Sequence, residues 1–429
     1  MSSPATPARV QAPGWSTPSI LRVCLVSIWL VDAIFLGAVI AGARMHRAAM
    51  KTVGRDTAPS IIAAQRIKYA MAGMDSTETE MLLSKPDSRL SSRYANLRVE
   101  AITALLSAAE NITYGDQERS PLRHLALGLS DYGELAQRAN DLHGLKDPQF
   151  IAAYRMAANV VDARYTAADQ LDNANRTALN RIYDSIQRNS IGNRSGVVIA
   201  GLILLFTLLS VQNFLTRNMR RVFNIPLVAA TFIAVGLMFY SFISFSHEML
   251  QLKVAKQDAF ESIDALWRAR ALAYMARADE SRYLLDEPHA AEYDQAYFSK
   301  TKDITEKYID AELHNITFPG ERDAANDTAR FFDDFLKADK EVRRLKQAGK
   351  RDAAIALCLG ADPGQAKWIF QQFDEALGRT LDINQTAFDA SVLHGEQTLE
   401  YFQTKAVVAC LAVGLLALVG LLSRIQEYR

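Results

Sequence analysis

The chain repeats one organisation twice, and this repetition constrains its fold more than any other feature. Each repeat has an apolar segment, a polar stretch of roughly 150 residues and a second apolar segment. The four apolar segments are each close to the ~20 residues that a helix needs to cross a bilayer. They occupy residues 20–43, 196–215, 225–245 and 406–422. The sequence therefore predicts a membrane protein with two large modules, the first at 44–195 and the second at 246–405.

The residues of the two modules match at several places. Three stretches of the first module return in the second in the same order and at nearly constant offset. They are Glu78–Pro86 with Glu280–Pro288, Asn111–Tyr114 with Asn315–Phe318, and Asn175–Leu179 with Asn384–Phe388. Agreement over three stretches indicates an internal duplication, so the two modules are expected to share one fold.

Composition predicts that both modules are helical throughout. Gly is sparse, Pro falls at breaks, and apolar residues recur at helical spacing. Pro86 and Pro288 are expected to end the first helices, and Ser120-Pro121 to begin a third helix. The fourth helix of each module is expected to run unbroken into the following span. The predicted fold class is all-α: an integral membrane protein with four transmembrane helices and two tandem extracytoplasmic four-helix bundles.

Charge predicts the orientation in the membrane. The short segments 1–22, 216–224 and 423–429 hold seven arginines against one acid, Glu427, which is typical of cytoplasmic segments. The arginines are Arg9, Arg22, Arg217, Arg220, Arg221, Arg424 and Arg429. Both termini are therefore expected in the cytoplasm and both modules outside it, in the cell membrane of a bacterium. The basic residues that follow the first span, Arg44 to Arg55, argue against this orientation.

The short segments have expected roles of their own. Residues 1–19, rich in Ser, Pro and Ala, are expected to form a disordered cytoplasmic tail. Residues 216–224 would form a cytoplasmic hairpin and residues 423–429 a stub. The first apolar segment has the small-residue pattern Ala41-Gly42-Ala43 of a signal-peptide cleavage site, but its length favours a retained anchor.

Polar residues interrupt the apolar stripes at matching positions of both modules. Glu78 and Glu280 do so on the first helices, and Asn175 and Asn384 on the fourth. One interpretation is that these residues set helix register, as a core Asn does in coiled coils. The other is that they line a ligand pocket between the helices.

Three further polar residues are candidates for function. Arg66 and Arg268 have almost the same offsets from their spans as the two stripe asparagines, so they are expected near the level of those residues. They could hold a carboxylate ligand through bidentate contacts, or they could be solvated. Asp32 lies in the middle of the first span, where a carboxylate is either functional or hydrogen-bonded to a Ser or Thr of a neighbouring helix.

No catalytic constellation appears in the sequence. It has no Gly-rich phosphate loop, no nucleophile motif and no Cys/His cluster with metal-ligand spacing. The net charge is zero and no basic stripe points to nucleic acid. We therefore expect no enzyme activity, no catalytic residue, no cofactor and no metal.

The architecture resembles the helical sensory domains of bacterial chemoreceptors and sensor kinases, without their cytoplasmic signalling helices. The duplicated topology, together with Tyr132–Ala139 and Ala153–Ala157, resembles that of GlnX-type four-span membrane proteins of actinobacteria. That family is associated with an extracytoplasmic amino-acid-binding lipoprotein and a cytoplasmic Ser/Thr kinase. The resemblance implies that amino-acid availability is transmitted across the membrane. An expected Asn-Arg-Gln-Gly run is replaced by His143–Lys146, so no binding residue of the family is carried over.

The leading functional prediction is thus a non-enzymatic sensor or signal transducer of the cell membrane. Its expected partners are an extracytoplasmic solute-binding protein, a cytoplasmic kinase and further copies of itself. The alternative is a structural or assembly protein whose modules mediate oligomerisation or scaffold a complex. A transporter is a third and weaker hypothesis, because four spans with one central carboxylate offer little substrate path.

Overall fold

The computed structural model describes residues 17–219 and 224–426, and all regular structure in these ranges is helical. Four helices are long and apolar enough to cross a membrane, as predicted. The predicted tail is wrong at its end, because Thr17 already begins helix α1 (Thr17–Lys51). Most of that tail, the centre of the hairpin and the end of the stub lie outside the described residues. So do Arg9, Arg220, Arg221, Glu427 and Arg429.

The chain divides into two compact units. One, here called the span unit, contains the described residues up to Ala48, Ser185–Leu250, and the described residues from Gly395 onward. It is built from α1, the end of α5 (Phe150–Met219), α6 (Ile225–Lys253) and α13 (Phe402–Gln426). Phe35, Leu204 and Leu208 pack in its core. Large apolar side chains also face outward, with Phe206 73% and Phe232 74% exposed, which fits helices surrounded by lipid.

The two exit spans differ. α5 runs without interruption from Phe150 to Met219, as predicted. In the second repeat the prediction is wrong, because α12 (Ala366–Thr398) ends before α13 begins at Phe402. Tyr401 has a left-handed φ of 55°, which a helix cannot continue through. Arg47 Nη2 donates to Leu399 O at 2.7 Å and so satisfies a carbonyl at the break.

The second unit, here called the polar unit, contains Ala49–Asp184 of the first module and Gln251–His394 of the second. The first module supplies α2 (Ala58–Leu83), α3 (Ser88–Glu110), α4 (Asp116–Gly144) and the start of α5. The second supplies α7 (Glu261–Leu285), η3 (Glu287–His289), α8 (Ala290–Asp303), η4 (Ile304–Ile309), α9 (Asp310–His314), α10 (Glu321–Gln347), α11 (Arg351–Leu359) and α12. Helix α11 was not predicted from the sequence.

Helix ends follow the local sequence, with one exception. α2 and α7 end three residues before Pro86 and Pro288, as predicted. The predicted start at Ser120-Pro121 is wrong, because α4 begins at Asp116 and Pro121 lies inside it. Glu118 Oε2 accepts hydrogen bonds from the backbone N–H groups of Thr113 and Tyr114 at 2.7 and 2.5 Å. These bonds fix the residues before Gly115, so the helix can begin directly after that glycine.

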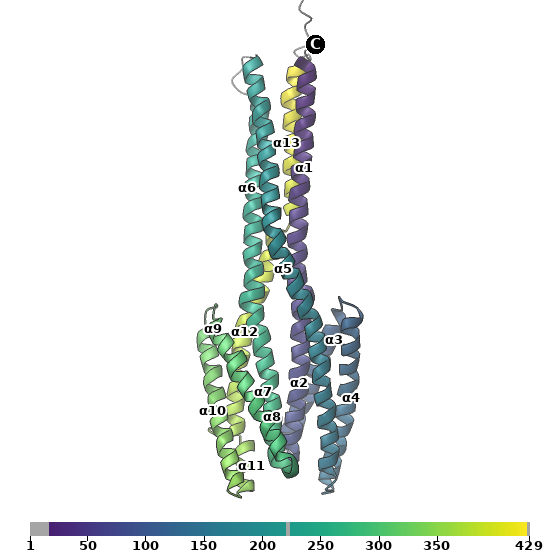
Figure 1. Cartoon of the computed structure of the whole chain (residues 1–429), viewed down its shortest axis with the longest axis vertical. Coiled ribbons are helices and arrows are strands. Elements are labelled where there is room, and N and C mark those ends of the chain that lie inside the picture. Colours follow the sequence, from purple (N-terminus) through teal and green to yellow (C-terminus); the bar gives the residue numbers. More distant parts are fainter. Residues whose placement is uncertain (1–16, 220–223, 427–429) are drawn as a thin grey trace, which may run out of the picture. The chain divides into compact units, whose positions relative to one another are not determined.

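The two modules meet along their first helices. α2 and α7 make the most extensive helix–helix contact in the polar unit and lie next to each other at its centre (Figure 1). Both helices carry small buried residues, which allow other helices to approach closely. They include Ala64, Ala70, Gly73, Ala269, Ala273 and Ala276, and a Cβ added at Gly73 would meet Leu97 of α3. Two short π-helical segments precede this contact in the chain, η1 (Thr52–Thr57) before α2 and η2 (Val254–Phe260) before α7.

Candidate functional site

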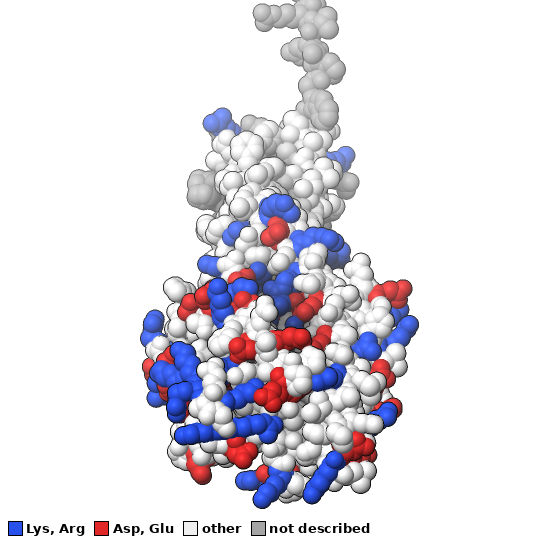
Figure 2. All heavy atoms as spheres, turned by 60° about the horizontal axis from the view of Figure 1, so that its bottom comes forward, with Lys and Arg blue, Asp and Glu red and all other residues white. Residues whose placement is uncertain are grey.

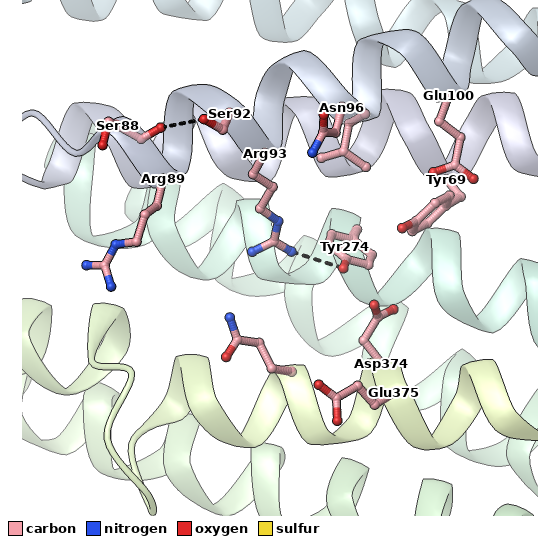
Figure 3. A pocket seen from close by; sticks show the side chains of 12 residues that line it. Tyr69, Ser88, Arg89, Ser92, Arg93, Asn96, Glu100, Tyr274, Asp374 and Glu375 are labelled. Atoms are coloured by element: carbon pink, nitrogen blue, oxygen red, sulfur yellow. Dashed lines mark hydrogen bonds between the residues drawn. The ribbon is translucent and has the colours of Figure 1, made fainter.

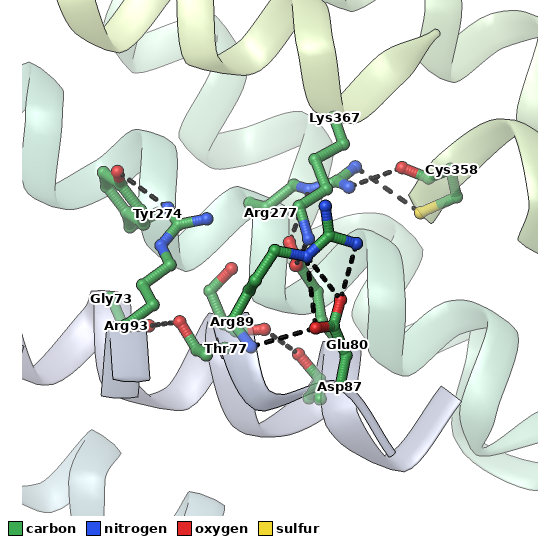
Figure 4. Close-up of polar contacts among 12 residues, drawn as sticks. Gly73, Thr77, Glu80, Asp87, Arg89, Arg93, Tyr274, Arg277, Cys358 and Lys367 are labelled. Atoms are coloured by element: carbon green, nitrogen blue, oxygen red, sulfur yellow. Dashed lines mark hydrogen bonds and ion pairs between the residues drawn. The ribbon is translucent and has the colours of Figure 1, made fainter. Parts of the chain in front are cut away.

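A buried ionic contact joins the two modules. α2 carries Asp75 and Glu80, α7 carries Arg277 and Arg282, and all four side chains are buried. Arg282 Nη2 donates to Asp75 Oδ2, and Arg277 Nε lies 3.5 Å from Glu80 Oε1. Lys367 of α12 approaches the other oxygen of Glu80 at 2.8 Å (Figure 4). Because an unpaired buried charge is strongly unfavourable, each of these acids depends on a base from the other module.

These charges occupy equivalent positions of the repeat. The offset of 202 residues that relates Glu78 to Glu280 also relates Asp75 to Arg277 and Glu80 to Arg282. Each acid therefore pairs with the base equivalent to the other acid, which is the crossed pattern of a two-fold interface. Two first modules packed in this way would bring carboxylates together, and two second modules would bring guanidinium groups together. The charges thus favour pairing between unlike modules.

A tyrosine extends this contact to a third helix. Arg282 Nε donates to the hydroxyl of Tyr154 on α5 at 2.8 Å, and that hydroxyl lies 3.1 Å from Asp75 Oδ1. Burial by itself would raise the pKa of Glu80, but the nearby Arg277 and Lys367 outweigh it and hold this pKa below its ordinary value. Glu80 therefore stays ionised within the contact.

A second set of ion pairs joins α7 to α5. Arg268 Nη2 donates to Asp172 Oδ2, and Arg176 Nη2 lies 2.5 Å from Asp264 Oδ2. From the sequence, Arg268 was expected near the level of Asn384, either holding a carboxylate ligand or solvated. In the structure its guanidinium instead pairs with Asp172 of α5, which belongs to the other module, and with Asp264 of its own helix.

The predicted stripe residues are buried. Glu78, Glu280, Asn175 and Asn384 are each at most 1% exposed. Asn140 Nδ2 of α4 donates to Glu78 Oε1 at 2.6 Å, and burial raises the pKa of Glu78 to about 8 despite this bond.

The stripe residues of the second module have charged neighbours. Glu280 accepts from Arg277, and Asn384 Nδ2 donates to Glu321 Oε1 at 2.6 Å. Asn175 Nδ2 donates to Leu171 O at 3.1 Å, one turn earlier on α5. Arg66 contacts residues other than Asn175. Its Nη2 lies 3.4 Å from Glu100 Oε1, and its guanidinium group packs over the ring of Trp267.

The repeated asparagines at the ends of the second helices brace the π-helical segments. Asn111 Nδ2 lies 3.1 Å from Arg55 O and 2.7 Å from Asp56 O, both within η1, and 2.9 Å from Ser60 Oγ. Asn315 makes the equivalent contacts with Asp258 O and Ser262 Oγ. Both asparagines directly follow a helix end. Their contacts with π-helices, which are frequent at functional sites, were not foreseen.

An open groove of about 700 Å³ lies where the modules meet. It is lined by α3 and α2 of the first module and by α7 and α12 of the second (Figure 3). Arg89 and Arg93 lie toward one end, and Glu100, Asp374 and Glu375 lie toward the other.

Charged faces look alike whether they line a groove or meet solvent, so the sequence offered no specific signal for this groove. The ionic contact had one: the run Asp75–Glu80 puts six consecutive polar residues on a helix, and all six are buried.

Two polar sites lie in the span unit. Asp32 and Cys410 line a cavity of about 330 Å³ between α1 and α13, and no Ser or Thr is among its lining residues, which come from the described part of the chain. Asp32 Oδ1 is buried and has no hydrogen-bond partner among the described residues. His46 and Glu248 form a fully buried pair that sequence analysis missed, and the His46 ring stacks on Phe245 at 4.8 Å.

Four apolar helices and a helical polar unit define this chain as a multi-pass membrane protein of the all-α class. Residues 49–184 match the family of actinobacterial sensor domains, which corresponds to the first module's part of the polar unit. The match supports a bacterial sensor family and fits a sensor role. No curated protein and no solved structure matches the chain.

Charged side chains of both signs are interspersed over the face of the polar unit in Figure 2. No broad area of one sign dominates this face. Its surface charge therefore gives no sign of a strongly acidic or basic partner.

Proposed function

We propose that the chain is a non-enzymatic membrane sensor that passes an extracytoplasmic signal, of the amino-acid class, to a cytoplasmic partner such as a Ser/Thr kinase. The observation that carries this proposal is the sensor-domain match at residues 49–184, which lie between the first two apolar segments, 20–43 and 196–215. The amino-acid signal and the kinase come from the resemblance to GlnX-type proteins.

The mechanism that we propose uses the contact between modules. Close-packed interfaces with paired charges shift between discrete arrangements, and helix displacements of about 1–2 Å are a common form of such switching. A ligand that binds better to one arrangement of α2 against α7 would shift the population toward it. α5 runs without interruption from Phe150 to Met219 and contributes to both units, so it is the element that would carry that shift.

The topology and partners belong to the same proposal. Both modules would lie outside the cytoplasm, where a solute-binding protein could deliver the signal, and the chain could form oligomers. The competing proposal, a structural or assembly protein, predicts no response of a cytoplasmic partner to a solute.

A phosphorylation experiment separates these proposals. Cells with and without the gene would be moved from amino-acid-poor to amino-acid-rich medium, and Ser/Thr phosphorylation would be measured across the proteome. We expect a set of sites that responds only when the gene is present. Asp75→Asn, which disrupts the buried contact, should reduce the response, while Asp87→Asn, at a half-buried acid outside this contact, should not. Equal responses with and without the gene would overturn the proposal of a kinase output.

A further inference from the structure

We propose that the groove between α3, α7 and α12 binds a small zwitterion of the amino-acid class, with its carboxylate on Arg93 and its ammonium group toward Glu375. This inference rests on the proposed sensor function and names the site and ligand class for it. No residue of this groove was a candidate from the sequence.

Arg93 is the cationic anchor of the proposed site. It is half-buried on α3, and its Nη2 donates to the Tyr274 hydroxyl at 3.0 Å across the module boundary. No carboxylate of the described residues lies within ion-pair distance of it, whereas Arg268, Arg270, Arg277 and Arg282 each have one. A guanidinium group has five N–H donors, so Arg93 keeps donors for a ligand carboxylate.

Nearby groups support an anion at this end of the groove. Arg89 is exposed on the preceding turn of α3 and adds positive charge, although Asp87 partly neutralises it at 3.0 Å. Asn96 and Gln371 line the groove with neutral polar groups that can bind either end of a ligand. The Tyr274 hydroxyl fixes the position of Arg93, which reduces the entropy lost on binding.

The acidic end is suited to an ammonium group. Asp374 is already neutralised by Arg270, whose Nε and Nη2 donate to it at 2.7 and 2.9 Å. Glu375 is exposed and has no ion-pair partner among the described residues, and Glu100 has only the 3.4 Å contact with Arg66. Figure 3 shows these acids on the side of the groove away from Arg89. A ligand with separated opposite charges matches this arrangement better than a simple anion or cation does.

The groove has no equivalent on the surface that the internal repeat relates to it. Two of its lining residues, Tyr69 and Tyr274, correspond through the offset of 202 residues to Ala271 and Ala72. The equivalent face therefore lacks both aromatic rings. The volume of about 700 Å³ falls within the usual range for small-molecule sites. We infer one such site per chain.

Binding would be measured by calorimetry on the full chain in lipid nanodiscs, with the twenty L-amino acids and the dipeptide Ala-Ala as separate probes. We expect at least one probe to bind. Its des-amino acid and its carboxamide should each bind at least tenfold more weakly, because each lacks one of the two charges. Failure of every probe to bind, or equal affinity for the capped analogues, would overturn the zwitterion site.

Variants assign the binding to this groove. Arg93→Ala should weaken binding about ten- to a hundredfold, as expected for the loss of a charge-assisted contact. Glu375→Gln should weaken it about fivefold. Arg98→Ala removes the same charge from an exposed position of α3 outside the groove and is the matched control. It should bind within threefold of wild type, and equal losses in Arg93→Ala and Arg98→Ala would overturn the assignment.

The two proposals fail in different ways. If the wild-type chain binds a probe but cells show no response that depends on the gene, the groove stands and the signalling proposal fails. If Arg93→Ala cells respond as wild type does, the signalling proposal stands and the groove is not its sensor.

Discussion

The two modules share a fold pattern but carry opposite charges at the heart of their contact. Asp75 and Glu80 of the first module correspond to Arg277 and Arg282 of the second. The pairs they form are buried and crossed, so neither module could make the same contact with a copy of itself. This difference teaches why a duplicated chain can be more specific than a symmetric dimer: once fused, the two copies could diverge in charge.

A second difference lies near the π-helical segments. Ala108 lies three residues before Asn111, and Glu312 lies three residues before the equivalent Asn315, so the two positions correspond; both are buried. Glu312 and Glu321 both lie against Asn384 Nδ2, at 3.5 and 2.6 Å. Burial raises the pKa of Glu312 to about 7; the Ser262 hydrogen bond opposes this rise and the Glu321 carboxylate adds to it. Both modules thus have an asparagine that contacts the π-helical segment, but only the second module has a titratable residue, Glu312, at the position of Ala108.

The largest expected effect tests whether the two modules can meet at all. Alkaline phosphatase fused after Asp116 or after Glu321 should be active in both cases, because the contact requires both modules on one side of the membrane, and the arginine-rich short segments predict that this side is outside the cytoplasm. Reporter activity at the two points would be compared with that of a cytoplasmic reporter. Phosphatase activity at one point only would mean that the two modules lie on opposite sides of the membrane and cannot make the contact. Activity of only the cytoplasmic reporter at both points would mean that both modules lie in the cytoplasm.

The next effect concerns the crossed pairs. Arg282→Ala leaves Asp75 buried without its base, while Asp279 keeps Lys300, and should lower the free energy of unfolding of the polar unit by about 3–5 kcal/mol. Denaturant unfolding of the full chain in nanodiscs would measure this. Arg344→Ala, which breaks an exposed pair with Glu341, is the matched control and should leave the midpoint unchanged. A double-mutant cycle with Asp75→Asn should show coupling, and strict additivity would contradict the pairing.

A smaller expected effect is a pH dependence of stability that comes from Glu312 of the second module and has no counterpart at Ala108 of the first. Because the pKa of folded Glu312 is raised to about 7, its contribution to stability is full below about pH 4.5 and is lost as the pH rises through 7. Glu312→Gln should therefore stabilise the polar unit at pH 8 relative to wild type, on the order of 2 kcal/mol, with little change at pH 4.5. Unfolding midpoints measured from pH 4.5 to 8.5 would test this. A parallel shift at all pH values would show that titration is not the cause.

The smallest effect compares the two π-helix braces. Asn111→Ala removes three side-chain contacts and Asn315→Ala removes two. Each should cost about 1–2 kcal/mol, with the larger loss in the first module. Hydrogen exchange at η1 and η2 would show local opening in the module that carries the substitution. Faster exchange in both segments from one substitution would mean that the braces act jointly.

Much of the fold could be predicted from the sequence because the signals are local. Helical periodicity predicted the all-α class and the burial of Glu78 and Asn384, and Pro86 and Pro288 marked helix ends correctly. The break before Phe402 escaped prediction because no Gly or Pro marks it. Tyr401 adopts a left-handed conformation within the packed span unit, and Arg47 binds the carbonyl of Leu399 there.

The sequence by itself determined the repeat, the four apolar helices and the positions at which polar groups enter the helical stripes. Only the tertiary structure decided which groups meet. An arginine on an amphipathic helix looks the same whether it faces water, its own module or the other one, so the partners of Arg268 and Arg282 could not be inferred. The groove beside Arg93 likewise exists only because α2 packs against α7. Local sequence governs helix formation, but the pairing of charges depends on packing between residues that lie some 200 positions apart.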